Sequence, residues 1–404
     1  MASPARVSLK AFLATARKAL AAPPAQRQNP LTFVIGNESA DLDSLCSAVL
    51  LAYFRSQTPP HTLHIPLSNL PRADLALRPE LGAILRPAGL QPDDLLTLSD
   101  LPRDGLRPEN TRWFLVDHNA PTGDLASQFT SASSSPSDLL IGCIDHHDDE
   151  DTIPSSAPRT FAKCGSCISL IVDHCRPAWD SLPSSSPDET TISSQLAHLA
   201  LGPILIDTSN LASRDKTTPW DIRAVEFTES KIHSSTNYDR TAYFDEITRL
   251  KEDISSLSYR DVLRKDYKRW TDGGLALGIS SVVQGLEYLT TEFGSKEEFL
   301  DELRRWAKEQ RLDIAAVMTT SRPGGKFTRE LLVWAYGEDA VKVARQFAKR
   351  DTEALGLEKW REGDLDDAAS AGEWRVCWVQ KGVEHSRKQV APMLRDAMKE
   401  AAKL

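Results

Sequence analysis

The stretch Gly36-Asn37-Glu38-Ser39-Ala40-Asp41-Leu42-Asp43-Ser44 decides how the chain folds around its polar residues. The apolar run Leu31–Ile35 before it predicts a buried strand, and the periodic apolar stretch Leu45–Phe54 after it predicts a helix. Asp41 and Asp43 therefore stand two residues apart at the end of a buried strand. Two such carboxylates need solvent, hydrogen-bond donors or a cation. Alone, the pair is most often a helix cap or a solvated loop.

Acidic residues follow three further apolar runs in the first half of the chain. These are Asp117-His118-Asn119 after Trp113–Val116, Asp145-His146-His147 after Leu139–Ile144, and Asp207-Thr208-Ser209-Asn210 after Pro203–Ile206. Taken singly, each is also compatible with a turn, a helix cap or a capped loop. In an open parallel sheet, however, ligands bind outside the carboxyl ends of the strands. Four acidic strand ends on one rim predict one crevice that holds several carboxylates and imidazoles.

The carboxylates gathered in such a crevice repel one another strongly at low effective dielectric. Either the pKa values of the carboxyl groups rise, or divalent cations lie among them. Shells of carboxylate and imidazole suit Mn²⁺, Mg²⁺, Co²⁺ or Zn²⁺. Because the ligands suffice for two ions that share one carboxylate, we expect two-metal phosphoryl hydrolysis, in which the ions neutralise charge on the phosphate.

The first half of the chain alternates short apolar runs with helical patterns, which predicts βα units and a parallel, Rossmann-like sheet. The expected strands are Leu31–Ile35, Thr62–Leu67, Trp113–Val116, Leu139–Ile144 and Pro203–Ile206. The expected helices are Leu45–Phe54, Leu75–Leu85, Cys167–His174 and Gln195–Gly202. Two Ser-rich stretches with Pro, Ser131–Ser137 and Ser181–Ser194, are typical of surface loops.

After Trp220 a charged amphipathic pattern at Tyr243–Leu257 predicts a helix that joins two domains. Beyond it we expect strands at Leu275–Val283, Ile314–Thr320, Leu331–Tyr336 and Trp374–Val379, and helices at Lys296–Gln310, Ala340–Leu355 and Gln389–Leu404. The sequence thus predicts an α/β protein in three parts. These are a catalytic metal-binding domain over residues 1–225, a connecting helix region over 226–258, and a smaller α/β or α+β domain over 259–404. We expect the active site in the cleft between the two domains.

The bulk composition is that of an ordinary soluble protein, with 41% hydrophobic and 26% charged residues among 404. No apolar run approaches the length that spans a bilayer, so we expect no membrane partner. The net charge of −9 argues against nucleic-acid binding by bulk attraction. An anionic substrate must then be held by metal ions or by locally placed Lys and Arg.

The cysteines and the N-terminus each leave a choice. Six cysteines in this length do not indicate a disulfide scaffold, and the single CxxC, Cys164-Gly165-Ser166-Cys167, favours buried reduced thiols over a zinc site. Residues 1–37 carry basic but no acidic residues, as in a mitochondrial presequence. We favour the alternative, an amphipathic helix Leu9–Leu20 packed on the first domain of a cytoplasmic protein.

These segments resemble the DHH phosphoesterase superfamily, which is named for the triplet found here as Asp145-His146-His147. More narrowly, the chain is similar to the fungal cytosolic exopolyphosphatases, relatives of the family II inorganic pyrophosphatases. The segments that carry the similarity are GNESADLDS, VDHNAP, IDHHDDE, IDTSN, CGSCISLIV and SRKQVAP. They occur in the family's order from Leu31 to the C-terminal helix.

The resemblance implies a metal-binding role for five of the matched residues. Asp41 would bind the first metal and Asp43 the second. Asp117 would bridge the two ions, and His146 and Asp207 would complete the second site.

Three neighbouring residues have other implied roles. Asp145 would orient the imidazole of a metal-bound histidine, and His147 would contact a phosphate of the substrate. The pyrophosphatases have a His four residues before the first Asp of D-x-D, where this chain has Asn37. An amide oxygen or a water there makes the first site harder and more tolerant of Mg²⁺. This departure favours the exopolyphosphatase branch and leaves open whether Asn37 binds metal.

The second domain offers cations for an anionic substrate. Ser386-Arg387-Lys388-Gln389 has the form of a capping box, which places Arg387 and Lys388 in the first turn of a helix. The macrodipole disfavours cations there, so an anion drawn to the same helix end would explain them. Solvated surface cations are the alternative, and the family's SRK segment implies phosphate binding.

Two further basic segments are candidates for substrate contacts. In Lys265-Asp266-Tyr267-Lys268-Arg269-Trp270, similarity to the phosphate lysine of the pyrophosphatases favours Lys268, with Lys265 second and a solvated charge run as the alternative. Arg322 and Lys326, in the Gly-rich turn Ser321–Phe327, would line a path for a longer chain of phosphates.

We therefore expect an exopolyphosphatase, a metal-dependent hydrolase that releases terminal orthophosphate from linear inorganic polyphosphate. The expected catalytic residues are Asp117, His147, Arg387 and Lys388, and the expected cofactors are two divalent cations, Mg²⁺ or Mn²⁺, with Co²⁺ as an alternative. We expect a monomer. One alternative is hydrolysis of pyrophosphate or of another short phosphoanhydride or nucleotide. The other is a catalytically silent interaction protein of the same fold. The acidic residues present at all four expected strand ends argue against this alternative.

Overall fold

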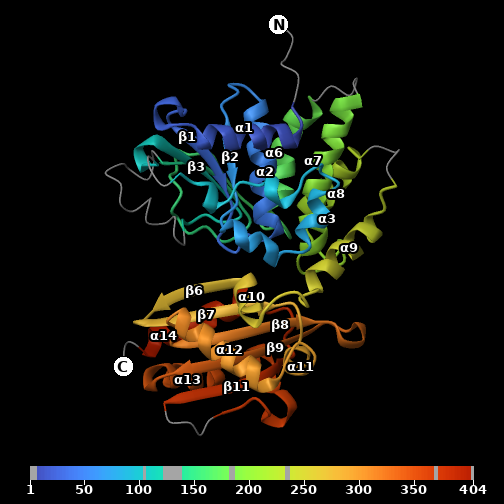
Figure 1. The fold of residues 1–404 in the computed structure, drawn as a ribbon. Helices are drawn as coiled ribbons and strands as arrows, with labels where there is room; N and C mark the ends of the chain where they lie inside the picture. The colour runs from blue at the N-terminus through green and yellow to red at the C-terminus, as the bar shows by residue number, and fades with distance from the viewer. Residues whose placement is uncertain are drawn as a thin grey trace. The chain divides into compact units, whose positions relative to one another are not determined.

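The computed structural model describes residues 7–102, 106–121, 139–181, 187–232, 237–367 and 372–401. Its contacts divide the chain into two compact units, Met1–Leu250 and Lys251–Leu404 (Figure 1). The three-part division expected from the sequence stays a prediction. Among the described helices, none combines the length and the apolar character that crossing a membrane requires.

The first unit is built on a five-stranded sheet in which every neighbouring pair of strands is parallel. The strands are β1 (Leu31–Ile35), β2 (His64–Leu67), β3 (Thr111–Val116), β4 (Leu140–Asp145) and β5 (Arg159–Phe161), in the order β2-β1-β3-β4-β5. The predicted Rossmann-like sheet is confirmed, with four of the five expected strands. The short strand β5 was not predicted.

The strand order reverses direction between β1 and β3. The chain leaves β1 toward β2 on one side and returns to β3 on the other side of β1. In doubly wound sheets with this order, ligands bind at the carboxyl ends of the two strands where the direction changes. The quoted stretch Gly36–Ser44 follows β1, and Asp117 follows β3, so both lie at this switch point.

The helices of the first unit pack on the strands of this sheet or on one another (Figure 1). They are α1 (Leu9–Ala21), α2 (Leu42–Gln57), α3 (Leu81–Leu85), α6 (Cys167–Asp180), α7 (Pro187–Asp207), α8 (Pro219–Glu229) and α9 (Arg240–Glu252). α2 is buried along most of its length because it packs against β1, β2, α6 and α7. The predicted N-terminal amphipathic helix is confirmed as α1, whose apolar residues Leu9, Phe12, Leu13, Ala16 and Leu20 lie in the core.

One predicted strand is wrong. Pro203–Ile206 and the predicted helix Gln195–Gly202 are one helix, α7, and Pro203 lies inside it. Most residues of Leu196–Leu205 are fully buried, so this part of the helix is apolar on all sides and shows no helical period. A short apolar run of this kind cannot be assigned to strand or helix by periodicity. Asp207 therefore ends a helix and does not follow a strand.

Several predicted boundaries also differ from the structure. Residues 187–194, within the predicted loop Ser181–Ser194, open α7, whereas residues 182–186 and the predicted loop Ser131–Ser137 lie outside the described residues. The predicted helix Leu75–Leu85 divides into a 3-10 turn, Arg72–Leu77, and α3. The predicted helix Tyr243–Leu257 ends earlier, at Glu252.

The second unit contains a mixed six-stranded sheet. Its strands are β6 (Tyr267–Asp272), β7 (Leu275–Val282), β8 (Ile314–Ser321), β9 (Thr328–Tyr336), β10 (Leu357–Lys359) and β11 (Glu373–Gln380), in the order β10-β11-β9-β8-β7-β6. β7 and β8 are parallel, and the other neighbouring pairs are antiparallel. The smaller α+β domain is thus confirmed, although β6 and β10 were not predicted.

Helices cover both faces of this second sheet, which explains its continuous apolar runs. They are α10 (Tyr259–Lys265), α11 (Leu286–Thr291), α12 (Lys296–Glu309), α13 (Glu338–Leu355) and α14 (Arg387–Ala401). In β8, Ile314 and Ala316 pack in the cluster of α13 and α14, whereas Ala315 and Val317 pack in the cluster of α10 to α12. Alternate residues of one strand therefore complete two separate cores.

Gly142 in β4 provides a test of the first sheet. A Cβ atom at this position would overlap the ring of Phe114 in β3. We expect Gly142→Ala to lower the free energy of unfolding by about 1–3 kcal/mol, as overpacking of a core usually does. Gly82→Ala in α3 is the matched control, because a Cβ there meets nothing within 4 Å. Urea unfolding followed by circular dichroism measures both, and equal stability of the two variants would contradict the packing described for β3 and β4.

Candidate metal centre

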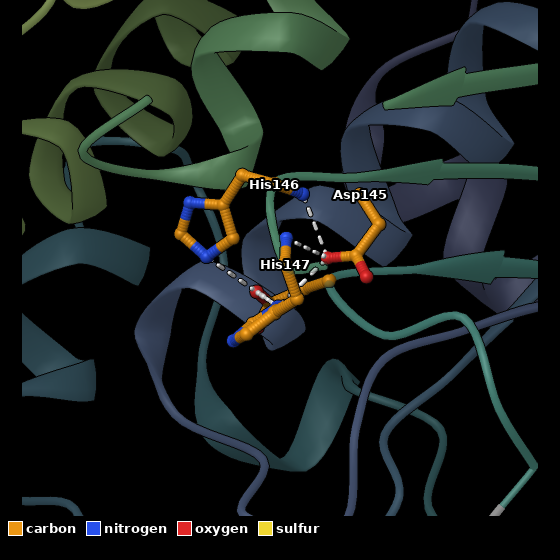
Figure 2. Close-up of side chains that lie close together, drawn as sticks. Asp145, His146 and His147 are labelled. Carbon is orange, nitrogen blue, oxygen red and sulfur yellow. Dashed lines mark hydrogen bonds and ion pairs between the residues drawn. The ribbon is translucent and has the colours of Figure 1, made fainter. Parts of the chain in front are cut away.

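The end of β4 places Asp145 in a shell of hydrogen-bond donors. Asp145 is fully buried, and its Oδ1 accepts from the backbone N–H groups of His146 (2.7 Å) and His147 (3.2 Å) and from Nδ1 of His147 (2.8 Å). Its Oδ2 accepts from Nδ2 of Asn119 at 2.6 Å. Figure 2 shows the Asp145 carboxylate turned toward His147. Both carboxylate oxygens of Asp145 are therefore engaged, and the ring of His147 is fixed by one of them.

His146 turns its ring away from Asp145 (Figure 2). Its Nδ1 lies 3.0 Å from the carbonyl oxygen of Cys164, which can only accept, so Nδ1 carries a proton. Its Nε2 lies 3.3 Å from Oδ1 of Asp117. A second proton or a cation must lie between this nitrogen and the carboxylate oxygen, since two lone pairs would otherwise face each other.

Asp117 follows β3 and is held by residues that follow β1. Its carboxylate is buried, and Oδ2 accepts from Oγ of Ser44 (2.6 Å) and Nδ2 of Asn37 (2.8 Å). Nδ2 of Asn37 also donates to the Asp117 carbonyl oxygen at 3.1 Å. Asp117 has a φ of 60°, in the left-handed region that non-glycine residues seldom adopt. This backbone strain at the switch point is typical of a functional residue.

Asp41 and Asp43 lie at the start of α2. Asp41 is exposed and is the N-cap of α2, where its Oδ1 accepts from the backbone N–H of Ser44 at 3.0 Å. Asp43 is buried and faces the start of a second helix, α6, whose Cys167 and Ile168 donate backbone N–H groups to it at 2.6 and 2.9 Å. Asp41 is thus a helix cap, as the alternative interpretation of the pair expected. The cap uses Oδ1 of Asp41, and Oδ2 of the same carboxylate could bind a cation.

Asp207 is the last residue of α7. Its Oδ2 accepts from Oγ of Ser166 at 2.8 Å, and Ser166 directly precedes the residues that donate to Asp43. Three residues with left-handed φ angles, Ser209 to Leu211, end the helix immediately after it. A negative charge at the C-terminal end of a helix is unfavourable. A nearby cation would offset this cost.

The carboxyl groups of this cluster influence one another. Burial, together with the charges of Asp117 and Asp41, raises the pKa of Asp43 to about 7. Burial also raises the pKa of Asp117. Burial alone would lower the pKa of His146, but hydrogen bonds to Asp117 and Cys164 raise this pKa well above its usual range. Burial would raise the pKa of Asp145, yet its bonds with His147 and Asn119 hold it well below the usual range.

These observations fit a divalent cation. Ligand atoms of Asp117, Asp145, His146 and His147 all lie within 4.8 Å of one another. Asp43 and Asp41 are close enough to Asp117 to shift pKa values. Carboxylate and imidazole ligands suit Mn²⁺, Co²⁺ and Zn²⁺, and the carboxylate-rich side suits Mg²⁺. The six cysteines, including both of Cys164-Gly165-Ser166-Cys167, are free thiols.

Within the second unit, the structure joins two basic segments that are far apart in the sequence. Arg387 opens α14, and its guanidinium donates to the carbonyl oxygen (2.9 Å) and Oδ1 (2.7 Å) of Asp266. Burial would raise the pKa of Asp266, but the charges of Arg387, Lys268 and Lys251 lower it. Arg387 and Lys268 therefore lie near the same carboxylate.

The other residues predicted to bind substrate differ in their location and exposure. One half of the predicted capping box is present, because the backbone N–H of Ser386 donates to Oε1 of Gln389 at 2.9 Å. Oγ of Ser386 accepts from the backbone N–H of Lys388 at 3.3 Å, whereas the backbone N–H of Gln389 donates to the carbonyl oxygen of Ser386. Lys388 is exposed, and Lys265 ends α10. Lys326 and Arg322 are exposed on the connection between β8 and β9.

The structure adds residues that the sequence did not single out. Ser44 and Asn119 hold Asp117 and Asp145, and Ser166 holds Asp207. All three lie inside segments quoted for their acids or cysteines. Hydroxyl and amide side chains are common in every loop, so residue type alone gave no signal for them.

Two family models match the chain. The family model described as "DHH family, N-terminal domain" matches residues 32–204, and the model described as "DHHA2 domain" matches residues 245–397. A Schizosaccharomyces pombe protein named "Putative exopolyphosphatase" is 33% identical over 92% of this chain and 92% of its own length.

More distant relatives carry two kinds of name. Human "Exopolyphosphatase PRUNE1" is 25% identical over 92% of this chain and 77% of its own length. A "Manganese-dependent inorganic pyrophosphatase" of Methanothrix thermoacetophila is 25% identical over 71% of this chain and 80% of its length. The crystal structure of a Methanococcus jannaschii "putative family II inorganic pyrophosphatase" covers 91% of this chain and 99% of its own, with a TM-score of 0.58 and 20% identity. The last similarity shows a shared fold.

The raised pKa of Asp43 predicts how the stability of the metal-free protein depends on pH. Because folding raises this pKa from 3.8 to about 7, the stabilisation by the bound proton is complete below about pH 4. It is lost as the pH rises through about 7. With EDTA present, we expect the free energy of unfolding to fall more steeply between pH 4.5 and 7.5 in the wild type than in Asp43→Asn. Urea titrations across this range measure how the free energy of unfolding of each protein changes with pH. Equal slopes for the two proteins would contradict a raised pKa of the buried Asp43.

Proposed function

This chain belongs to the DHH phosphoesterase family, and from that premise we propose that it is an exopolyphosphatase that releases terminal orthophosphate from linear inorganic polyphosphate. It combines a DHH domain with a DHHA2 domain, and its 33%-identical relative is named for this activity. The cluster of Asp117, Asp145, His146 and His147 at the carboxyl ends of β3 and β4 carries the proposal, because such a cluster can bind the divalent ions of a metal-dependent hydrolase.

Two divalent ions, Mg²⁺ or Mn²⁺, are the proposed cofactors. Asp41, Asp43, Asp117, His146 and Asp207 would hold them. When bound, the ions would supply charge neutralisation at the phosphoryl oxygens and an activated water. Asp117 faces Nε2 of His146 on one side and is fixed by Asn37 and Ser44 on the other, so it would serve as the shared ligand.

Asn37 would act mainly by orienting Asp117. Its amide nitrogen donates to Asp117 twice, and its Oδ1 accepts from the backbone N–H of Ser39 at 2.9 Å. One lone pair of Oδ1 is left for a ligand or a water. The position that carries a metal-binding His in pyrophosphatases would thus carry a positioning amide here.

The chain's own side chains would bind and orient the phosphates. His147 is fixed through Nδ1 by Asp145, and its imidazole would donate to a phosphate oxygen of the substrate. Arg387 and Lys388 in the first turn of α14, and Lys268 in β6, would bind the negative charges of the substrate. Lys265, Arg322 and Lys326 would contact more distant phosphates of a long chain. The proposal includes a monomeric, cytoplasmic enzyme.

Substrate choice separates this proposal from its nearest alternative. With Mg²⁺ present, we expect orthophosphate release from long-chain polyphosphate to be faster than from pyrophosphate at equal concentrations of terminal phosphate. A malachite-green assay of both substrates measures it. Pyrophosphate as the only good substrate would instead favour a pyrophosphatase, the activity named for the Methanothrix thermoacetophila relative.

Asp117→Asn tests the shared-ligand role. We expect a fall in kcat of about 1,000-fold or more, because several kcal/mol of charge stabilisation depend on this carboxylate. The near-isosteric amide should leave the circular dichroism spectrum unchanged. Asp148→Asn is the control, since the Asp148 side chain is 92% exposed and pairs with Lys163 on the surface. Turnover of Asp117→Asn at the level of Asp148→Asn would refute the role.

Arg387→Ala tests the proposed phosphate contact in the second unit. We expect kcat/KM for polyphosphate to fall by about 100-fold, as on removal of one charged transition-state contact. The affinity for Mn²⁺ should be unchanged. Arg395→Ala is the matched control, because Arg395 lies on the same helix and also pairs with an aspartate, Asp272, at 2.6 Å. Equal activity of the two variants would count against substrate binding by Arg387.

A further inference from the structure

Asp221, outside the quoted motifs, is a buried carboxylate beside the candidate metal centre. It is the third residue of α8 and is fully buried. With the N-cap Thr218 it forms a capping box, in which its Oδ2 accepts from N and Oγ1 of Thr218, both at 2.8 Å. A capping role alone would use only one of its oxygens.

The remaining contacts of Asp221 reach across to the loop that precedes α6. Its Oδ2 accepts from the backbone N–H of Gly165 at 2.9 Å. Its Oδ1 accepts from the backbone N–H of Ser166 (3.3 Å) and from Oγ of Ser169 (2.7 Å). All five of these partners are donors, so both oxygens of Asp221 must act as acceptors.

The segment Cys164–Ile168, which Asp221 holds, contacts three of the proposed metal ligands. The contacts are Nδ1 of His146 to the carbonyl oxygen of Cys164 (3.0 Å), Oγ of Ser166 to Asp207 (2.8 Å), and the backbone N–H groups of Cys167 (2.6 Å) and Ile168 (2.9 Å) to Asp43. A shift of this segment would therefore change the orientation of His146, Asp207 and Asp43 together.

Packing leaves this segment little freedom. A Cβ atom on Gly165 would lie 2.6 Å from Cγ2 of Thr208 and 3.0 Å from the carbonyl oxygen of Lys216. It would also lie 3.2 Å from Oδ2 of Asp221. The loop thus packs tightly between the residues after α7 and the start of α8. Its hydrogen bonds to Asp221 fix its position relative to the proposed metal ligands.

We propose that Asp221 is a positioning residue of the metal centre, which acts through the Cys164–Ile168 segment to align His146, Asp207 and Asp43. The inference rests on the proposed metal-dependent function, although it concerns ion binding and not hydrolysis. Partners that orient metal ligands typically contribute about 10- to 100-fold to metal affinity or activity. In Asp221→Asn, one acceptor oxygen becomes an NH₂ donor that faces other donors, so the segment must move.

The test compares Asp221→Asn with Asp100→Asn in the full-length protein. Asp100 is also the third residue of a capping box, in the 3-10 turn Leu98–Asp100, and its side chain is 17% exposed. Asp100 forms ion pairs with Arg17 and Arg72, both at 2.6 Å. Neither partner is a proposed metal ligand. Both substitutions remove a structural carboxylate from the first unit.

Mn²⁺ binding is measured by the loss of the free-ion electron paramagnetic resonance signal, without polyphosphate. We expect the dissociation constant for Mn²⁺ to rise about 10- to 100-fold in Asp221→Asn and to stay within about threefold of wild type in Asp100→Asn. Thermal unfolding with EDTA should show a lower melting temperature than the wild type for both variants. An unchanged dissociation constant in Asp221→Asn, an equal rise in Asp100→Asn, or a wild type that binds no Mn²⁺ would each overturn the proposal.

Ser169→Ala is the second variant, used if Asp221→Asn does not fold. It removes one donor to Asp221 and leaves the carboxylate in place. We expect the dissociation constant for Mn²⁺ to rise about fivefold, the size of one lost hydrogen bond, and no change would overturn the proposal. Because none of these measurements uses polyphosphate, a failure of the exopolyphosphatase assay would leave the result for Asp221 standing.

Discussion

The first unit depends on the compensation of buried negative charge at the carboxyl ends of the strands around its switch point, where the strand order reverses. Asp43, Asp117 and Asp145 are each at most 3% exposed and lie around the carboxyl ends of β1, β3 and β4. Three such groups coexist only if donors, protons or cations balance them. Asp145 has donors for both oxygens. Asp43 and Asp117 also accept hydrogen bonds, but burial and the neighbouring carboxylates leave part of their negative charge uncompensated and raise the pKa of each. This imbalance is what a divalent cation would relieve.

The compensation begins with ordinary secondary-structure physics. Asp41 caps α2, and Asp43 accepts N–H groups from the first turn of α6, so two helix N-termini are directed at the D-x-D segment. Asn37 and Ser44 connect the end of β1 to Asp117 after β3. The switch-point geometry therefore follows from a strand order that places β1 and β3 side by side, and the polar residues complete it.

The sequence allowed the first sheet and most of this cluster to be predicted because βα units leave a regular pattern. Apolar runs that end in Asp identified Asp117 and Asp145 correctly as strand-end residues. The same pattern failed at Asp207, because Leu196–Leu205 of α7 is buried on every side and its apolar run cannot be told from a strand. Asp207 was nevertheless placed near the other acids by family resemblance, and in the structure Ser166 connects it to the segment that binds Asp43. Asp221 gave no signal, since a capping-box Asp is common in soluble proteins.

In the second unit, periodicity predicted the long strands and helices but not the contact between Arg387 and Asp266, which are 121 residues apart. Such pairings depend on how α14 packs against β6 and β7, which the hydrophobic pattern does not specify.

The central claim, that acids from separate segments of the first unit form one site for two divalent ions, is tested most directly by a crystal soaked in Mn²⁺. Anomalous scattering at the manganese edge locates the ions without reference to activity. We expect two peaks that share Asp117, one beside Asp41 and one beside His146 and Asp207. A structure with no peak within bonding distance of Asp117, at a Mn²⁺ concentration that saturates binding in solution, would contradict it.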